Sequence, residues 1–370
     1  MAETKQSQKA GDNSQLLQAN AITIVNGIDE KRVREICAEI YEIARKNFTE
    51  DAYMCANERV QKFENALVSR MEAIENAYSA FADPSFQFLL TSAQKTAAAT
   101  ERDADYDMLA ELLACRIAKG DSRKNRAGIS QAVEIIDKID GDALCALTVV
   151  YAVSTFIPLS GEFTAGLQTL NNLFEKIIYI DLPKGSDWIE HLDILNAVRI
   201  SPSESIKKMR TYYCERLKGY SSAGIEINSE EHKKALKILQ DVNLDFNVLR
   251  TNPNMSNYVL LPVRNRDSIS DLQIVPTING IPVNEHRKIR NEEKAALEAI
   301  WDLYTTDTNV NKVAEDSFIA HWDGFPALKK VHLWWDNVPV AFNITHVGAV
   351  LAYTNAKRCD KNVPELPLLT

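Results

Sequence analysis

Side chains that can transfer protons or bind metal ions are most concentrated near the C-terminal end of the sequence, in a stretch that is also rich in tryptophan. Their spacings match no common metal-ligand pattern, and histidines beside aromatic residues more often pack and form hydrogen bonds than catalyse. An enzyme or metal site here is a hypothesis that requires the three histidines to converge on one cleft. The candidate polar cluster consists of His321, Asp323, His332, Asp336 and His346.

Three alternating aspartates, Asp103, Asp105 and Asp107, resemble the first half of a calcium-binding loop. Such a loop needs glycine at its sixth position and a bidentate glutamate at its twelfth, where this sequence has Met108 and Ala114. Carboxylates at the start of a helix are favourable because they face the positive end of its dipole. The aspartates are therefore expected to begin a helix, and no metal or cofactor is expected.

Familiar catalytic motifs are missing from the sequence. It has no phosphate-binding G-x-x-x-x-G-K-[ST], no G-x-G-x-x-G after a strand, no H-E-x-x-H, no G-x-S-x-G and no C-x-x-C. These absences lower the expectation of an enzyme without removing it, because many active sites leave no local signature. A non-enzymatic role is the leading hypothesis.

The charge and the cysteines indicate a cytoplasmic protein. A net charge of −9 favours solubility and weighs against broad contact with nucleic acid or an anionic membrane. The six cysteines are widely spaced and are expected to be reduced. The polar start lacks the features of a signal peptide, and the apolar stretch 143–159 is shorter than the roughly 20 residues that span a bilayer, so a buried core helix is expected there.

Apolar residues recur every three or four positions through most of the chain, which predicts a mainly α-helical protein. Residues 1–27 are expected to form a flexible tail that ends in one short strand, Ala19–Val25. A single strand leaves backbone groups unpaired, so it must pair with another part of the chain or with a second copy.

Residues 28–82 are expected to form two helices, of which the second, from Thr49 to Pro84, carries a heptad-like apolar stripe. The stripe could pack within its own bundle or form a coiled-coil contact between subunits, with Arg70 setting the register. The second alternative, together with the strand, predicts a homo-oligomer. The residues of this hypothetical assembly surface are Ile22, Ile24, Val60, Phe63, Leu67, Arg70, Ile74 and Phe81.

The rest of the chain divides into a helical array at 84–256 and a small α+β unit at 257–370. In the second unit a hairpin is predicted across Asp336-Asn337, followed by a last helix that Thr345 caps. Helix, helix, hairpin and helix are compatible with a winged-helix-like fold and hence with a DNA-binding regulator. However, acidic residues slightly outnumber basic ones over 284–370, which weighs against DNA binding.

Three short segments carry a resemblance to known proteins. They begin with Gly11-Asp-Asn-Ser-Gln15, with Asp105-Tyr-Asp-Met-Leu-Ala-Glu-Leu-Leu-Ala114, and with Ile344-Thr-His-Val-Gly348. In this order they resemble a loose group of uncharacterised bacterial proteins related to the abortive-infection alpha family, whose terminal Leu-Thr-x-x-Gly motif has isoleucine in place of leucine here. The resemblance implies a helical bacterial protein linked to phage defence, and it supplies no catalytic residues.

Taken together, these features favour a self-associating helical protein that presents its array to an unknown protein partner, with a role in bacterial anti-phage defence. An enzyme with a site in the histidine- and tryptophan-rich region and a DNA-binding regulator are the two alternatives. The residues 160–283 resemble nothing that indicates a role.

Overall fold

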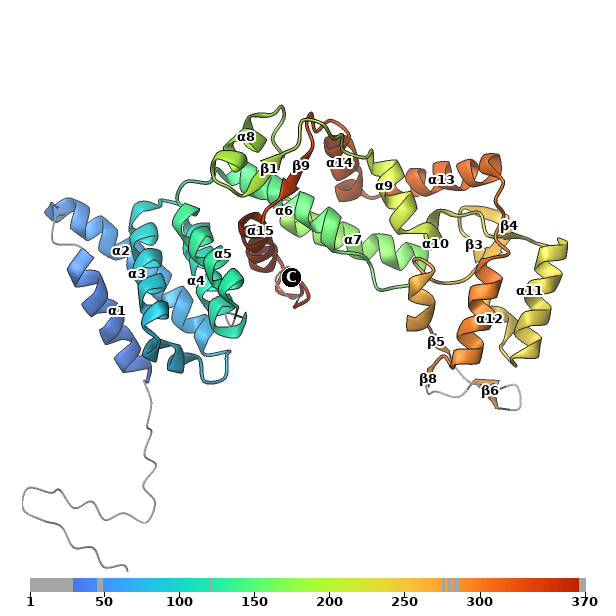
Figure 1. Ribbon diagram of the computed structural model, residues 1–370, viewed down its shortest axis with the longest axis horizontal. Coiled ribbons are helices and arrows are strands. Elements are labelled where there is room, and N and C mark those ends of the chain that lie inside the picture. The colour runs from blue at the N-terminus through green and yellow to red at the C-terminus, as the bar shows by residue number, and fades with distance from the viewer. Residues whose placement is uncertain are drawn as a thin grey trace, which may run out of the picture.

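The chain is mainly α-helical, as the spacing of its apolar residues predicts. Figure 1 shows an elongated molecule with a helical bundle at one end, further helices in the middle and a lobe of helices and short strands at the other end. The predicted strand with Ile22 and Ile24 lies outside the described residues. The computed structural model describes residues 29–44, 49–119, 122–274, 277–278, 281–282 and 287–365.

Two helices of the first bundle begin at residues that favour a helix start. Pro84 occupies the first turn of its helix, and the Asp83 side chain accepts a hydrogen bond from the backbone N–H of Ser85. Ser122 accepts from the N–H of Asn125 in the same way. The bundle consists of α1 (Glu30–Ala44), α2 (Glu50–Met71), a 3-10 helix η1 (Ala77–Ala82), α3 (Pro84–Ala99), α4 (Asp103–Lys119) and α5 (Arg123–Ile135).

The apolar stripe of α2 packs inside this bundle. Val60, Phe63 and Leu67 are buried, and α2 contacts α3 and α4 of the same chain. Arg70 forms ion pairs with Asp107 and Glu111 of α4 (3.0 and 3.1 Å). Of the two alternatives for the stripe, packing within its own bundle is the one observed, because these side chains are already covered.

The second predicted helix is shorter than expected. It ends at Met71 rather than at Pro84, and Asn76 has a φ of 55°, a left-handed conformation that asparagine tolerates better than most residues. The backbone therefore turns there before η1, where Phe81 is buried and Ile74 packs at the margin of the core. The heptad-like stripe is therefore not carried by one continuous helix.

The middle of the molecule is built around a helix that is buried on all sides. Residues 143–153 of α6 are buried at every position, which explains the apolar stretch in the sequence. Among the described residues no helix is both long and apolar enough to cross a membrane. The middle of the molecule consists of α6 (Gly141–Thr155), α7 (Phe163–Ile177), α8 (Asp187–Ile194), β1 (Val198–Ile200), α9 (Met209–Arg216), α10 (Lys218–Ser221), α13 (Thr308–Asp323), α14 (Pro326–Trp335), β9 (Phe342–Ile344) and α15 (His346–Cys359).

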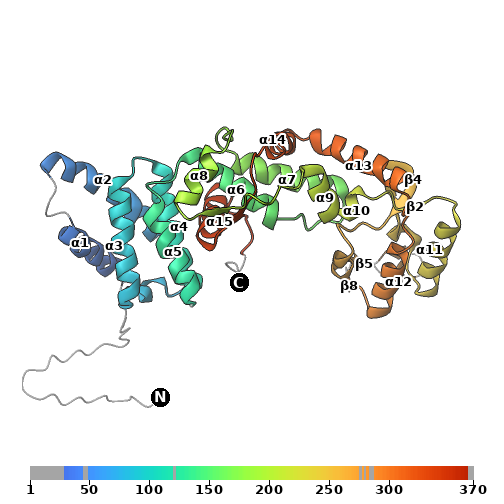
Figure 2. The ribbon, with the colours of Figure 1, turned by 45° about the horizontal axis from the view of Figure 1, so that its top comes forward.

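The far lobe has a hydrophobic core of its own. Three antiparallel strands in the order β2-β4-β3 are covered by helices, as Figure 2 shows from a second angle. Residues 277–278 and 281–282 pair as a short antiparallel hairpin. The lobe consists of β2 (Ile225–Glu226), α11 (Glu230–Asp241), η2 (Phe246–Val248), β3 (Arg250–Asn252), β4 (Met255–Leu260), η3 (Asp267–Asp271), β5 (Gln273–Ile274), β6 (Thr277–Ile278), β7 (Ile281–Pro282), β8 (Arg287–Lys288) and α12 (Asn291–Trp301).

The hairpin predicted in the C-terminal half of the unit at 257–370 is wrong. Residues 326–335 are helical instead of forming the first strand of a hairpin, and β9 pairs with the distant β1 in antiparallel register. Residues of α13, α14 and α15 join the large core of the first two thirds of the chain, whereas α12 belongs to the second core. The unit is thus divided between two cores, and the hairpin that a winged-helix fold needs is not observed in the described residues.

Candidate binding groove

The predicted polar cluster comes together only in part. His332 lies between Asp323 and Asp336, with Nδ1 2.8 Å and Nε2 3.7 Å from their carboxylate oxygens. Asp336 also accepts a hydrogen bond from the backbone N–H of Met209 at 2.8 Å, where α9 begins. These three residues therefore join α13, α14 and α9, which is a structural role.

The other two histidines make separate contacts. Nδ1 of His321 lies 2.9 Å from the carbonyl oxygen of Ser317 in its own helix, and its ring packs edge-on against Phe163. His346 lies at the start of α15 with both ring nitrogens buried, and burial lowers its pKa, as does the nearby Lys124. Across the described parts of the chain no group of three or more histidine, cysteine or acidic side chains is placed to hold a metal ion.

Three buried thiols are poor nucleophiles. Burial raises the pKa of Cys37 and of Cys214 to about 12 and that of Cys145 to about 11. A cysteine acts as a nucleophile in its thiolate form, so these thiols remain protonated and unreactive near neutral pH.

A pocket with an apolar wall lies between α14, the start of α8 and the loop 178–186. Lys330, Leu333 and Trp334 share one face of α14 because they are three and four positions apart. Gly185 allows the loop its turn, since it has a φ of 75°. The pocket has a volume of about 600 Å³, and we refer to it as the aromatic groove; its residues are Asp181, Leu182, Pro183, Lys184, Gly185, Trp188, Lys330, Leu333, Trp334, Asn337, Val338 and Pro339.

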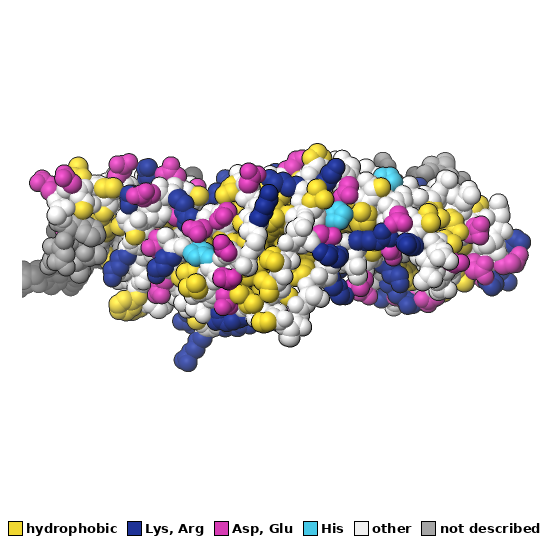
Figure 3. All heavy atoms as spheres, turned by 90° about the horizontal axis from the view of Figure 1, so that it is seen from above, with side chains coloured by type: hydrophobic (Ala, Val, Ile, Leu, Met, Phe, Trp, Pro, Cys, Tyr) yellow, Lys and Arg dark blue, Asp and Glu magenta, His cyan; other side chains and the backbone are white. Residues whose placement is uncertain are grey.

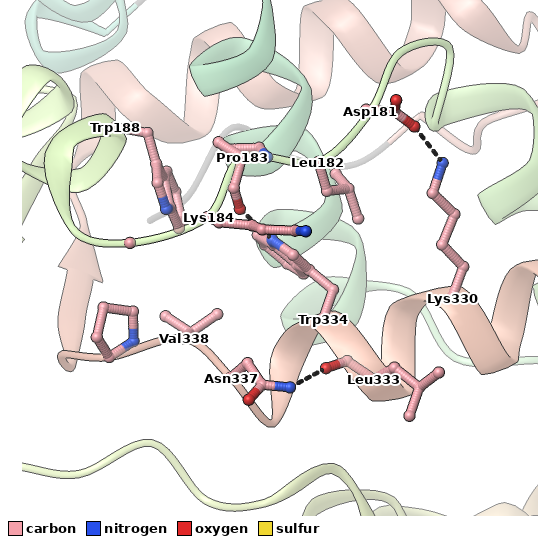
Figure 4. A pocket seen from close by; sticks show the side chains of 12 residues that line it. Asp181, Leu182, Pro183, Lys184, Trp188, Lys330, Leu333, Trp334, Asn337 and Val338 are labelled. Atoms are coloured by element: carbon pink, nitrogen blue, oxygen red, sulfur yellow. Dashed lines mark hydrogen bonds and ion pairs between the residues drawn. The ribbon is translucent and has the colours of Figure 1, made fainter.

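Two tryptophans hold the aromatic groove in shape. The indole N–H of Trp334 donates to the carbonyl oxygen of Pro183 at 2.8 Å, which ties the loop to α14. The rings of Trp188 and Trp334 lie 5.7 Å apart with a tilt of 39°. Figure 4 shows these rings with Leu182, Pro183 and Val338 around a common space. The two rings therefore pack on each other and form one aromatic wall, against which an apolar ligand group can pack.

The aromatic groove also has an exposed apolar rim. Leu333 on α14 is 57% exposed although it is a large apolar residue. Figure 3, which looks onto the side that carries α8 and α14, shows hydrophobic side chains gathered in the middle of this face with Lys and Arg beside them. Apolar side chains that cluster at the surface around a pocket mark interaction sites.

A protein-family model matches residues 27–366, which is nearly the whole chain, and its description reads “:-like”. The chain belongs to this family. No curated protein and no solved structure matches it. The description of the family gives no activity, so a function for this member has to be argued from its own geometry.

A second hollow, of about 730 Å³, lies between α2, α4 and α15. Several of its charged groups bind one another: Arg70 pairs with Asp107 and Glu111, and Lys357 pairs with Glu365. A charged ligand beside Arg70 or Lys357 would have to displace these internal partners, whereas an apolar group in the aromatic groove displaces none. The groove is for this reason the stronger candidate.

The sequence pointed to one of the two tryptophans that line the aromatic groove. Trp334 belongs to the tryptophan-rich stretch, whereas Trp188 and Lys184 lie in the region to which no role was assigned. The other tryptophans of that stretch are structural: Trp322 and Trp335 donate to the carbonyl oxygens of Leu328 and Lys207. The local signal for the rest of the lining was a Pro-Lys-Gly turn that ends three positions before Trp188, at the start of a helix.

Proposed function

We propose that this chain is a non-enzymatic interaction protein that holds a segment of a partner protein in the aromatic groove. The observation that carries the proposal is a preformed apolar pocket with the exposed Leu333 at its rim. Preformed pockets of roughly 300 to 1,000 Å³ with apolar and aromatic walls are typical binding sites. Tryptophans in such places contribute disproportionately to binding energy.

We further propose that the protein acts in the cytoplasm of a bacterium as part of anti-phage defence. All six cysteines are free in the structure, which suits a reducing compartment. The link to defence rests on the resemblance of segments such as 105–114 and 344–353 to proteins related to the abortive-infection alpha family. The family match supports the relatedness of the whole chain to one protein group and does not extend to this role.

Self-association remains a prediction, but the apolar residues of α2 no longer support it. Val60, Phe63 and Leu67 are buried in their own bundle, so a second copy cannot pack against them. The prediction now depends on the strand expected at 19–25, which lies outside the described residues and would need a pairing partner.

The test is affinity purification of the tagged full-length protein from its own host, with partners quantified by mass spectrometry. We expect a partner that the wild type retains and that Leu333→Asp loses, because a carboxylate at the rim opposes entry of apolar groups. Phe88→Asp is the matched control, since Phe88 is 76% exposed on α3 and does not line the groove. Equal recovery with both variants contradicts the proposal.

A further inference from the structure

We propose that the loop 261–265 holds the far lobe against the middle of the molecule, and that the lobe undocks as a unit when this loop separates, while both hydrophobic cores stay folded. We refer to this loop, which lies between β4 and η3, as the latch loop. Figure 1 shows the lobe at one end of the elongated molecule, beyond α7 and α10. Such a motion is independent of the aromatic groove, which lies in the middle of the molecule.

The far lobe is inserted into the chain at one place. The chain enters it after α10 and leaves it after α12, and the backbone N–H of Thr305 in the second connection donates to the carbonyl oxygen of Gly224 in the first at 2.9 Å. Asn252 of β3 also donates to the carbonyl oxygens of Ser222 and Ala223. The buried apolar residues of the lobe form a cluster separate from the large core. A unit with its own core and adjacent ends has the anatomy of an inserted domain, so it can move about the paired connections without disturbing either core.

Hydrogen bonds to backbone atoms join the latch loop to the middle of the molecule. The N–H of Gly219 in α10 donates to the carbonyl oxygen of Arg264 at 2.8 Å. The Arg264 guanidinium donates to the carbonyl oxygen of Leu159 at 3.3 Å, and the Asn265 side chain donates to that of Arg216 at 3.5 Å. Such bonds contribute little net stability, because water replaces them when the partners separate. Undocking therefore costs less free energy than unfolding an apolar core.

Two glycines allow the latch loop to approach the middle of the molecule closely. A methyl group added at Gly219 would collide with the carbonyl oxygen of Val263, and one added at Gly161 would collide with that of Pro262. Neither glycine has a positive φ, so the backbone at both positions suits alanine. Alanine at either position therefore opposes docking of the loop and leaves the local backbone conformation unstrained.

The joint is incompletely packed and incompletely hydrogen-bonded. A hollow of about 520 Å³ lies beside the latch loop, with Lys218 on the side of the middle and Trp301 on the side of the lobe. Asn254 donates across the joint to the carbonyl oxygen of Tyr220, but its Oδ1 and the Nε of Arg264 are buried without a hydrogen-bond partner among the described residues. Buried polar groups without partners are unfavourable, and undocking would let water reach them.

The experiment is hydrogen–deuterium exchange of the full-length protein, resolved to single amides, in wild type, Gly161→Ala and Gly219→Ala. The probe is the amide at position 219, whose hydrogen bond crosses the joint. After correction for intrinsic rates, we expect it to exchange roughly tenfold faster in both variants, and amides of α6 and α12 to stay within about twofold of wild type. Gly141→Ala is the matched control and should behave as wild type, since its added methyl group meets nothing closer than 3.7 Å.

The wild type supplies a second measurement that does not require a variant to fold. Its Gly219 amide should exchange roughly tenfold or more faster than that of Ile300 in α12, because undocking precedes unfolding of the lobe. Equal rates at these two amides would overturn the inference. Two results in the variants would also overturn it: unchanged exchange at position 219, which means that the latch loop does not hold the lobe, and equally accelerated exchange throughout α12, which means that the lobe unfolds when it separates.

Discussion

Replacing Glu293 with glutamine should destabilise the far lobe by about 2 kcal/mol, because this buried carboxylate connects β8 to the start of α12. Its oxygens accept from the guanidinium of Arg287 at 2.6 and 2.7 Å and from the backbone N–H of Arg290 at 2.8 Å. These hydrogen bonds hold the pKa of Glu293 at about 2, against an ordinary value of 4.5. One pKa unit corresponds to about 1.4 kcal/mol, which sets an upper limit of roughly 3 kcal/mol.

We expect less than this limit because the two arginines are partly exposed and water competes for them. The assay is urea unfolding at pH 7, followed by circular dichroism, with Glu292→Gln as the control. Glu292 is the exposed neighbour of Glu293 in the same first turn. Equal stability of the two variants would refute the reasoning.

The dependence of this effect on pH has a definite sign. The pKa of Glu293 is lowered in the folded protein, so its contribution is complete above the ordinary value of 4.5 and is lost as the pH falls through about 2. The difference in unfolding free energy between wild type and Glu293→Gln should therefore shrink as the pH is lowered from 5 toward 2. A difference that stays constant over this range contradicts the assignment of the stabilisation to the ionised carboxylate.

Three further predictions concern packing, thiols and assembly. Gly128→Ala should lower the unfolding free energy by about 1 to 3 kcal/mol, because the added methyl group would lie 2.4 Å from the ring of His346; Gly141→Ala, whose nearest contact is 3.7 Å, should change it far less. In a thiol-reagent assay at pH 7.5, the exposed Cys55 should react fast and the buried cysteines only upon unfolding. Deletion of residues 1–27 should lower the number of subunits that light scattering gives for the particle in solution. An unchanged number of subunits would contradict assembly through the predicted strand.

Local patterns predicted the helices well and their partners poorly. Thr345 does cap the last helix, since its side chain accepts from the N–H of Gly348. The segment 332–335 was predicted as a strand because aromatic residues favour strands, yet Leu328 and Val331 at helical spacing are both buried and fix a helix instead. Burial of one face of the helix therefore outweighed the preference of a few aromatic residues for a strand.

Long-range pairing set the limit of what the sequence could predict. β9 pairs with β1, from which it is separated by more than 140 residues, and nothing local in either strand specifies that partner. Trp188 and Trp334 are similarly far apart in the sequence, so the aromatic groove that they line together could not be predicted. Asp105 was expected only to favour a helix start, but it is buried, where it pairs with Arg102 and accepts a hydrogen bond from Thr100.

The most direct test of the central claim is site-specific photo-crosslinking of the full-length protein in its own cells. A photoreactive phenylalanine analogue at position 333 should yield one dominant crosslinked partner, because Leu333 forms the rim of the aromatic groove. The same analogue at the exposed position 88 should not capture that partner. No crosslink at position 333, or the same products from both positions, would contradict the claim that this groove holds a partner protein.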